Sequence, residues 1–189
     1  NALKGNNRFE CIFTDVAELD ICNAEAVKQT IADNHIDYIV NCAAYTQVDK
    51  AEDNAELCRK INTDAVENLA RAAATYGARM IHISTDYVFN GRGYRPYTEA
   101  MTPDPQSVYG STKLEGEKIL TDICPESIII RTAWLYSPYG NNFVKTMLHL
   151  GKEREELSVV SDQIGTPTCA ADLAQAILVI LQADTFVPG

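Results

Sequence analysis

The sequence has 189 residues and is 46% hydrophobic, enough to bury the core of one domain, or of one domain and part of a second. Its formal net charge of −10 argues against a nucleic-acid partner, because proteins that follow a phosphate backbone usually present a basic face. Every apolar run is shorter than the roughly 20 residues that cross a bilayer, so we expect no membrane partner.

The N-terminal part predicts a strand followed by a helix. Phe9–Thr14 is a short apolar run that ends at Asp15 and is typical of a buried strand. Asn23 then offers an N-cap to a helix that carries Val27 and Ile31 on one face.

The next elements continue this alternation. Tyr38–Asn41 predicts a strand, and Asn54 can cap a long alanine-rich helix that stops at Gly77, a residue suited to a left-handed C-cap. Arg79–Ser84 predicts a further strand. The segment 90–106 is rich in glycine and proline and predicts a long surface loop, a kind of loop that is usually functional.

The C-terminal part extends the pattern. We expect helices at 107–121, 143–152 and 170–183, and strands at 127–132 and 157–160. Strands that alternate with helices of ten or more residues indicate a parallel sheet covered on both sides. The sequence therefore predicts an α/β fold with a doubly wound parallel sheet.

Cysteines and histidines give no sign of a metal site. The six cysteines are scattered, with no C-x-x-C pair and no histidine at metal-ligand spacing. We expect reduced, mostly buried thiols and a cytoplasmic protein. His35, His82 and His149 lie far apart, and we interpret all three as structural.

Tyr109 and Lys113 form the first candidate for chemistry. A spacing of four places both on one face of a helix, and a nearby ammonium makes a phenol easier to ionise. The spacing alone is weak, because chance gives about 0.4 such pairs in a sequence of this composition, and a lone pair has at best even odds of being meaningful. Thr85 strengthens the case for a site. This residue ends a predicted strand, and ligands of doubly wound sheets bind beyond the carboxyl ends of the strands.

Longer segments carry a resemblance to a known family. The most specific of them are 41–52, 84–91, 96–99, 109–113, 131–136, 141–148 and 162–168. Through these segments the chain resembles the extended short-chain dehydrogenase/reductases, and among them the family of dTDP-4-dehydrorhamnose reductases. The resemblance spans nearly the whole chain and implies NADH- or NADPH-dependent reduction of a dTDP-linked 4-keto-6-deoxyhexose.

The resemblance also implies roles for individual residues. Tyr109 becomes the proton donor, Lys113 lowers its pKa and holds the nicotinamide ribose, and Thr85 lies beside the substrate carbonyl. Asp86 and Trp134 match substrate-contacting positions. The residues that match cofactor-binding positions are Asp15, Asp20, Ile21, Ala44, Tyr45, Thr46, Ile83, Tyr109 and Lys113.

Asp15 bears on the choice of cofactor. A carboxylate at the end of this strand favours a free ribose 2′-hydroxyl over a 2′-phosphate, so we expect NADH at least to be accepted. Both Asp15 and Asp20 have an alternative interpretation as plain strand-end and turn residues, where aspartate is common.

One expected part of a Rossmann-like fold is not found in the sequence. None of the ten glycines forms a G-x-x-G-x-x-G or G-x-G-x-x-G series after a strand, the loop that approaches a pyrophosphate. By comparison with the family, we expect the first strand to be missing, residues 1–133 to form a partial dinucleotide-binding domain, and 134–189 to begin a substrate-binding lobe. We also expect weak dinucleotide binding and a tendency to pair or aggregate through the open sheet edge.

Two other functions stay open. An NDP-sugar epimerase or dehydratase of the same superfamily uses a Tyr and a Lys at this spacing. A non-catalytic regulatory subunit, like that of methionine adenosyltransferase, also resembles this family. The resemblance further allows a homodimer.

Overall fold

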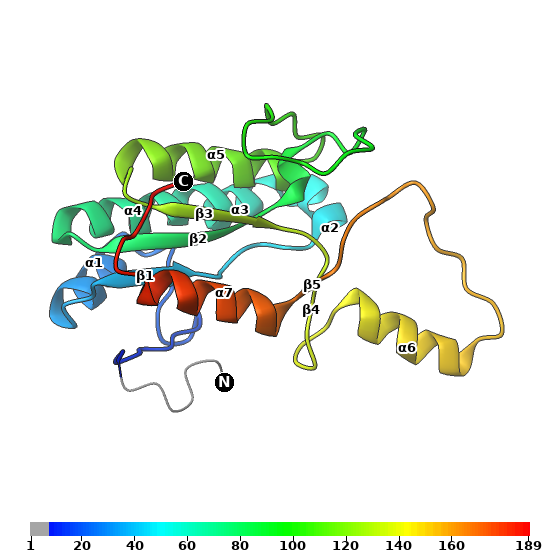
Figure 1. The fold of residues 1–189 in the computed structure, drawn as a ribbon, viewed down its shortest axis with the longest axis horizontal. Coiled ribbons are helices and arrows are strands. Elements are labelled where there is room, and N and C mark those ends of the chain that lie inside the picture. The colour runs from blue at the N-terminus through cyan, green and yellow to red at the C-terminus, as the bar shows by residue number, and fades with distance from the viewer. Residues whose placement is uncertain (1–7) are drawn as a thin grey trace. The chain divides into compact units, whose positions relative to one another are not determined.

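The computed structural model describes residues 8–189, which form two compact units. The larger unit comprises 9–131 and 187–189, and its centre is a sheet of three strands in the order β1-β2-β3 (Figure 1). The strands are β1 (Tyr38–Asn41), β2 (Arg79–Thr85) and β3 (Ile128–Thr132). β1 and β2 run parallel, with Tyr38 opposite Arg79 and Asn41 opposite His82. The predicted α/β fold with a parallel sheet is confirmed.

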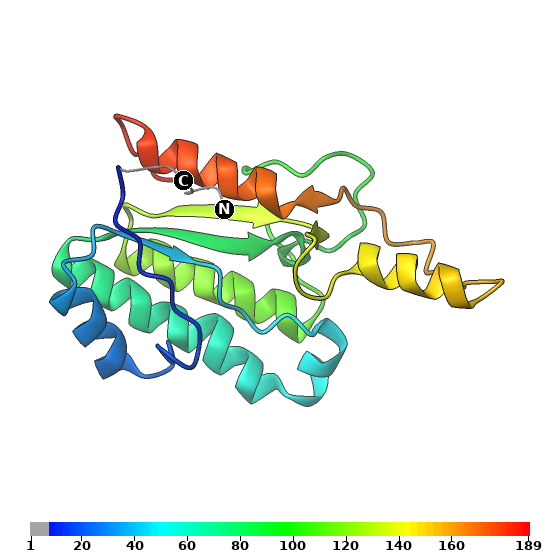
Figure 2. The same ribbon diagram turned by 90° about the horizontal axis from the view of Figure 1, so that it is seen from below.

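Helices cover one face of this sheet. Figure 2 shows α1, α4 and α5 together on that side. The helical segments of the larger unit are α1 (Ala24–Asp33), α2 (Val48–Asp53), α3 (Ala55–Arg59), a π-helical turn (Lys60–Asp64), α4 (Ala65–Tyr76), a 3-10 turn (Asp86–Val88) and α5 (Val108–Ile123).

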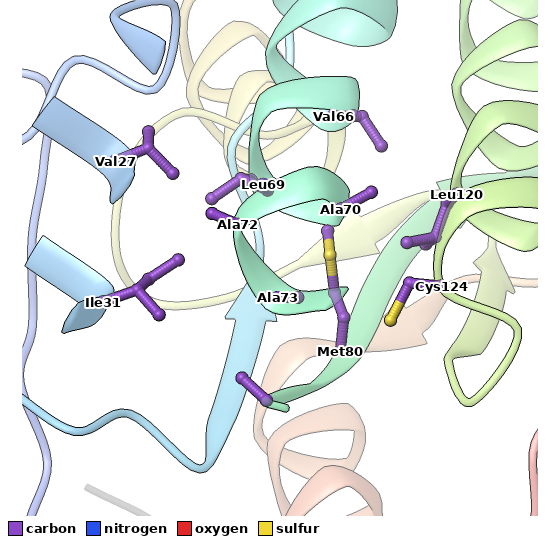
Figure 3. Packing of buried hydrophobic residues seen from close by; sticks show 11 residues of the cluster. Val27, Ile31, Val66, Leu69, Ala70, Ala72, Ala73, Met80, Leu120 and Cys124 are labelled. Atoms are coloured by element: carbon purple, nitrogen blue, oxygen red, sulfur yellow. The ribbon is translucent and has the colours of Figure 1, made fainter. Parts of the chain in front are cut away.

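The core lies between these helices and the sheet (Figure 3). α1 contributes Val27 and Ile31, α5 contributes Leu120, and β2 contributes Met80. α4 presents mainly alanines, whose small side chains let it pack closely against its neighbours.

Most local predictions for this unit are confirmed. The Asn23 side chain accepts a hydrogen bond from the Ala26 N–H at 3.1 Å and starts α1. Gly77 ends α4 with φ +74°, a left-handed conformation that costs glycine little. The segment 90–106 is a loop without helix or strand.

Three predictions for this unit are wrong. Phe9–Thr14 forms no strand, and the Phe13 side chain is 79% exposed, because a strand needs a hydrogen-bonding neighbour and the sheet formed within residues 8–189 provides none there. Asn54 precedes α3, but its side chain donates to the Lys50 carbonyl and caps nothing. Only Cys58 and Cys124 among the six cysteines are buried.

The smaller unit comprises Arg8 and residues 132–186. It contains a short parallel pair, β4 (Leu135–Tyr136) with β5 (Thr168–Cys169), and two helices, α6 (Phe143–Glu153) and α7 (Ala170–Gln182). The strand predicted at 157–160 is wrong, since this segment is irregular and Val160 is 61% exposed. Among residues 8–189, no helix is both long and apolar enough to cross a membrane. The predicted division at residue 133 stays a prediction.

Candidate active site

Thr85 and Tyr109 lie at the carboxyl end of β2. β2 ends at Thr85, whose hydroxyl accepts from the Tyr87 N–H at 3.2 Å and donates to Asp86 Oδ1 at 3.3 Å. Tyr109 is in the first turn of α5, is 8% exposed, and contacts the Tyr87 ring edge-on at 5.5 Å between centroids. The ends of β2 and α5 therefore bring two predicted catalytic residues into one buried place.

Two features at the start of α5 stabilise the position of Tyr109 beside the end of β2. Ser107 caps the helix by accepting from the Gly110 N–H at 3.1 Å. Gly110 itself faces the Tyr87 carbonyl so closely that a Cβ atom there would overlap it. Glycine after the tyrosine is thus required for α5 to approach the turn that follows Thr85.

Lys113 lies one turn further along α5 and is 1% exposed. Its Nζ donates to the Ile83 carbonyl at 2.7 Å and lies 3.1 Å from His82 Nε2. Burial lowers the pKa of Lys113 to about 8, although the Glu117 carboxylate acts in the opposite direction. Glu117 is in turn bound by Arg131 at 2.7 Å. Lys113 is therefore fixed to the β2 backbone and is a much weaker base than an exposed lysine.

The environment of Tyr109 shifts the pKa of its phenol. Burial raises the pKa of the Tyr109 phenol, and a hydrogen bond with Thr85 only partly opposes that effect. The prediction that Lys113 makes Tyr109 easier to ionise stays a prediction, because burial is the largest cause of this shift. Burial likewise raises the pKa of Asp86, while the hydrogen bond from Thr85 lowers it.

The predicted cofactor loop at 44–46 is held by a residue that sequence reasoning missed. Asn62 accepts from the Tyr45 N–H at 2.8 Å and donates to the Tyr45 carbonyl at 3.1 Å, so one amide satisfies both backbone groups. Asn62 is 1% exposed and belongs to the π-helical turn, a feature that often marks functional positions.

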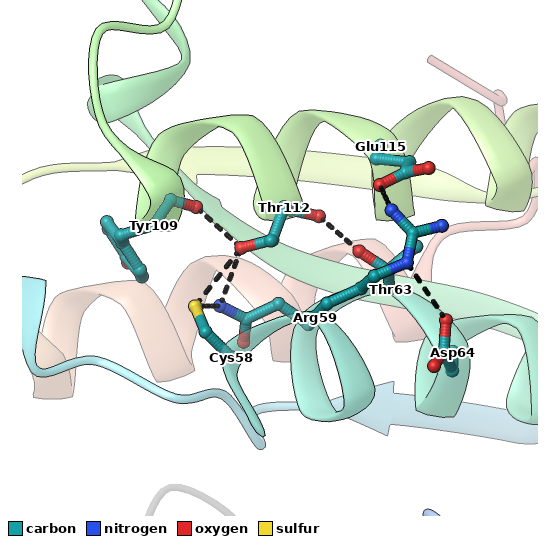
Figure 4. A network of polar contacts seen from close by, with 8 residues as sticks. Cys58, Arg59, Thr63, Asp64, Tyr109, Thr112 and Glu115 are labelled. Atoms are coloured by element: carbon teal, nitrogen blue, oxygen red, sulfur yellow. Dashed lines mark hydrogen bonds and ion pairs between the residues drawn. The ribbon is translucent and has the colours of Figure 1, made fainter. Parts of the chain in front are cut away.

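The same turn is joined to α5 by a polar network (Figure 4). Thr63 donates to the Thr112 carbonyl at 2.9 Å, and the Cys58 thiol lies 3.2 Å from the Thr112 hydroxyl. Gly116 lies against the Asn62 carbonyl so tightly that a Cβ atom would overlap it. The loop predicted to bind cofactor and the helix that carries Tyr109 and Lys113 are thereby set in one framework.

Asp15, Asp20 and Ile21 lie apart from this framework, in turns before α1. Asp15 Oδ1 accepts from the Val16 N–H at 2.7 Å, and Asp20 Oδ1 accepts from the Cys22 N–H at 2.9 Å. Ile21 offers its carbonyl to the Asn68 amide at 3.1 Å. The two carboxylates are thus engaged as turn residues, and their role toward a cofactor stays a prediction.

Trp134 belongs to the smaller unit. Its φ of +49° is unusual for a bulky residue, and its ring meets Phe143 edge-on at 5.2 Å. Gly165 packs directly against the indole, where a side chain would clash. The Trp134 side chain is therefore held by its neighbours, and its role toward a substrate stays a prediction.

Asn62, and His82 beyond the structural role interpreted for it, are the principal residues whose contacts at the site the sequence did not predict. The only available signal for His82 is its place in an apolar strand, three residues before Thr85. Its neighbour Asn41 becomes visible only through the β1–β2 register. Asn62 carries no sequence signal, because its partner is the backbone of a distant loop.

A parallel sheet, a hydroxyl at a strand end and a buried Tyr-x-x-x-Lys pair on the following helix define the class of the short-chain dehydrogenase/reductases. Within this class, the chain belongs to the family described as RmlD substrate binding domain, which matches residues 2–186.

Relatives support this assignment. The chain is 51% identical to a dTDP-4-dehydrorhamnose reductase of Escherichia coli K12, over 85% of this chain and 55% of that protein. It is also 51% identical to the enzyme of that name from Salmonella typhimurium, over 82% of this chain and 52% of that protein. The chain thus spans about half the length of the curated relatives it matches.

Solved structures support the same family assignment. A dTDP-4-dehydrorhamnose reductase from Clostridium acetobutylicum superposes with a TM-score of 0.91 at 50% identity, covering 95% of this chain and 63% of that one. The enzyme of that name from Bacillus anthracis, solved in complex with NADP, gives a TM-score of 0.89 at 45% identity, with 93% and 62% covered.

Proposed function

We propose that this chain provides the catalytic residues for the reduction of dTDP-4-dehydro-L-rhamnose to dTDP-L-rhamnose by NADH or NADPH. The observation that carries the proposal is the placement of Thr85, Tyr109 and Lys113 around the carboxyl end of β2. The chain is 51% identical to two proteins named dTDP-4-dehydrorhamnose reductase, and this similarity supports the same chemistry.

The residues present fit the nicotinamide end of a dinucleotide. Lys113 is held at the Ile83 carbonyl, the Tyr45 backbone is fixed by Asn62, and the Ser84 hydroxyl is buried without a partner among residues 8–189. The sequence itself contains no glycine-rich loop for a pyrophosphate. When bound, NADH or NADPH supplies a hydride to the C4 carbonyl of the sugar.

Tyr109 is the proposed proton donor. Reduction of a carbonyl adds one hydride to carbon and one proton to oxygen, and Tyr109 gives its phenolic proton to that oxygen. The raised pKa keeps the phenol protonated at neutral pH, which suits a donor. The Thr85 hydroxyl orients the carbonyl, and Lys113 binds the nicotinamide ribose.

The assay is cofactor oxidation with dTDP-4-keto-6-deoxyhexose as substrate. A reductase oxidises one NADH or NADPH per sugar reduced, whereas an epimerase or dehydratase recycles its cofactor. Stoichiometric oxidation that disappears in Tyr109→Phe supports the proposal, and turnover without net oxidation refutes it. Activity that is found only in a partner protein, and is unchanged in Tyr109→Phe, indicates the regulatory alternative.

The remaining expectations form part of this proposal. The net charge of −10 supports a small-molecule substrate and no nucleic-acid partner. We further propose a cytoplasmic homodimer in which 1–133 binds the dinucleotide and 134–189 begins the substrate lobe. Trp134 and Asp86 then contact the sugar nucleotide, and Asp15, Asp20 and Ile21 contact the adenosine.

A further inference from the structure

Trp134 has an unusual backbone conformation that contacts within its own unit hold in place. Its φ of +49° is rare for a bulky residue. The Trp134 carbonyl accepts a hydrogen bond from the Thr168 N–H at 3.3 Å, beside the parallel pair of β4 and β5. A conformation of this kind persists only where surrounding contacts fix it, and such positions are concentrated at functional sites. The backbone of Trp134 is thus tied to the start of β5.

The indole ring of Trp134 is positioned by packing rather than by a hydrogen bond. Within residues 8–189, no acceptor is found for its N–H. The Phe143 ring meets it edge-on, with 5.2 Å between centroids and 80° between planes. Phe143 is the first residue of α6, and the N-cap Asn142 fixes this end of the helix by donating to the Ser137 carbonyl at 2.8 Å.

Gly165 leaves the space that the other side of this packing requires. A Cβ atom at Gly165 would lie 2.5 Å from Trp134 Nε1 and 2.9 Å from Cδ1, closer than Cβ atoms approach other atoms in proteins. The φ of Gly165 lies outside the left-handed region, so its backbone conformation does not require glycine. The obstructing atoms belong to a side chain, whereas Gly110 and Gly116 face backbone carbonyls. A methyl group at 165 would therefore displace the indole before it displaced the backbone.

We infer that Gly165 is a positioning residue for Trp134, and that it thereby determines how the site accepts its sugar. Thr168, three residues further on, holds the Trp134 backbone, so one short stretch of chain fixes the backbone and makes room for the ring. The inference deepens the proposed function. The contact of Trp134 with sugar rests on that proposal, while the position of the ring does not.

The consequence for catalysis concerns binding more than chemistry. An indole offers a large, rigid apolar surface, and its displacement changes the fit of a hexose that lies against it. The proton donor and the hydroxyl that orients the carbonyl are Tyr109 and Thr85, which Gly165→Ala leaves unchanged. A displaced indole should therefore raise KM for the sugar nucleotide more than it lowers kcat.

The direct test is tryptophan fluorescence of the full chain without substrate or cofactor. Trp134 is the single tryptophan, so emission and acrylamide quenching report on this ring. Gly165→Ala should move the emission to longer wavelength and increase quenching, because the ring leaves its packed position. Gly151→Ala in α6 is the matched control, since a Cβ atom there meets nothing within 4 Å. Unchanged emission and quenching in a folded Gly165→Ala chain overturn the inference.

A double-mutant cycle keeps the test decisive if Gly165→Ala is poorly folded. In urea unfolding, Gly165→Ala should destabilise the wild-type chain but have almost no effect in Trp134→Ala, which lacks the indole. A Gly165→Ala chain that folds only when the indole is absent gives the same answer. Equal losses in both backgrounds overturn the inference, because Gly165 would then act independently of Trp134.

Steady-state kinetics test the consequence for the sugar. In Gly165→Ala, KM for dTDP-4-keto-6-deoxyhexose is expected to rise about 10-fold, with kcat and KM for NADH nearly unchanged. Gly151→Ala should leave all three values unaltered. A displaced indole with an unchanged KM for the sugar contradicts the role in sugar binding. Wild-type protein that oxidises no cofactor refutes the proposed function instead, and fluorescence and unfolding still decide what positions Trp134.

Discussion

The region around Lys113 and the turns at 15–21 are organised differently, although both carry predicted cofactor residues. Lys113, Tyr109 and Thr85 are buried. Lys113 contacts His82 and Ile83, and Tyr109 contacts Tyr87, so both have partners distant in the sequence. Within residues 8–189, the hydrogen bonds of Asp15 and Asp20 go to residues no more than four positions away. The arrangement of the proposed catalytic residues depends on packing between elements, while the 15–21 turns depend on local chain geometry. The following predictions test this contrast.

The largest effect is expected from Tyr109→Phe. Phenylalanine preserves the ring packing against Tyr87 but removes the proton donor, so kcat should fall by about 10²–10⁴-fold. Steady-state kinetics of cofactor oxidation measure this loss. Phe13→Leu, an exposed change outside the site, serves as the control. Near-normal kcat in Tyr109→Phe would exclude Tyr109 as the donor.

Burial of Lys113 should be visible in the pH dependence of stability. Its pKa is lowered to about 8 from 10.5, so between these values the unfolded chain binds more protons and stability rises with pH. Relative to Lys113→Met, the wild-type free energy of unfolding should rise by up to about 3 kcal/mol across this window. Urea unfolding at several pH values measures it. A difference that is flat with pH contradicts a buried Lys113.

Gly116→Ala should separate α5 from the π-helical turn. The new Cβ overlaps the Asn62 carbonyl, so we expect a loss of about 1–3 kcal/mol in unfolding free energy. Gly151→Ala in α6 is the matched control, because it meets nothing within 4 Å and should stabilise by up to about 1 kcal/mol. Equal effects at both positions would show that close approach at Gly116 is unimportant.

The smallest structural effect is expected in the 15–21 turns. Asp15→Asn retains an oxygen for the Val16 N–H, so the unfolding free energy should change by no more than about 0.5 kcal/mol. If Asp15 binds the ribose, the ratio of KM for NADPH to KM for NADH should fall in the same variant. An unchanged ratio leaves Asp15 as a turn residue, which is its only role visible in the fold.

Much of the fold could be predicted from the sequence, because its signals are local. Asn23 as an N-cap, Gly77 as a left-handed C-cap and the strand at Tyr38–Asn41 depend on residues close to them in the chain. Phe9–Thr14 has the same apolar pattern as a strand but forms none. A strand, unlike a helix, obtains its hydrogen bonds from a different segment.

The sequence by itself determined that Tyr109 and Lys113 share a helix face and that Thr85 ends a strand, since helix periodicity and chain order suffice for both. Only the tertiary structure decided the charge environment of that pair. The β1–β2 register places Asn41 beside His82, and packing of α5 on β2 brings His82 to Lys113. The pKa of a buried group depends on which donors and acceptors surround it, and these come from segments that meet only on folding.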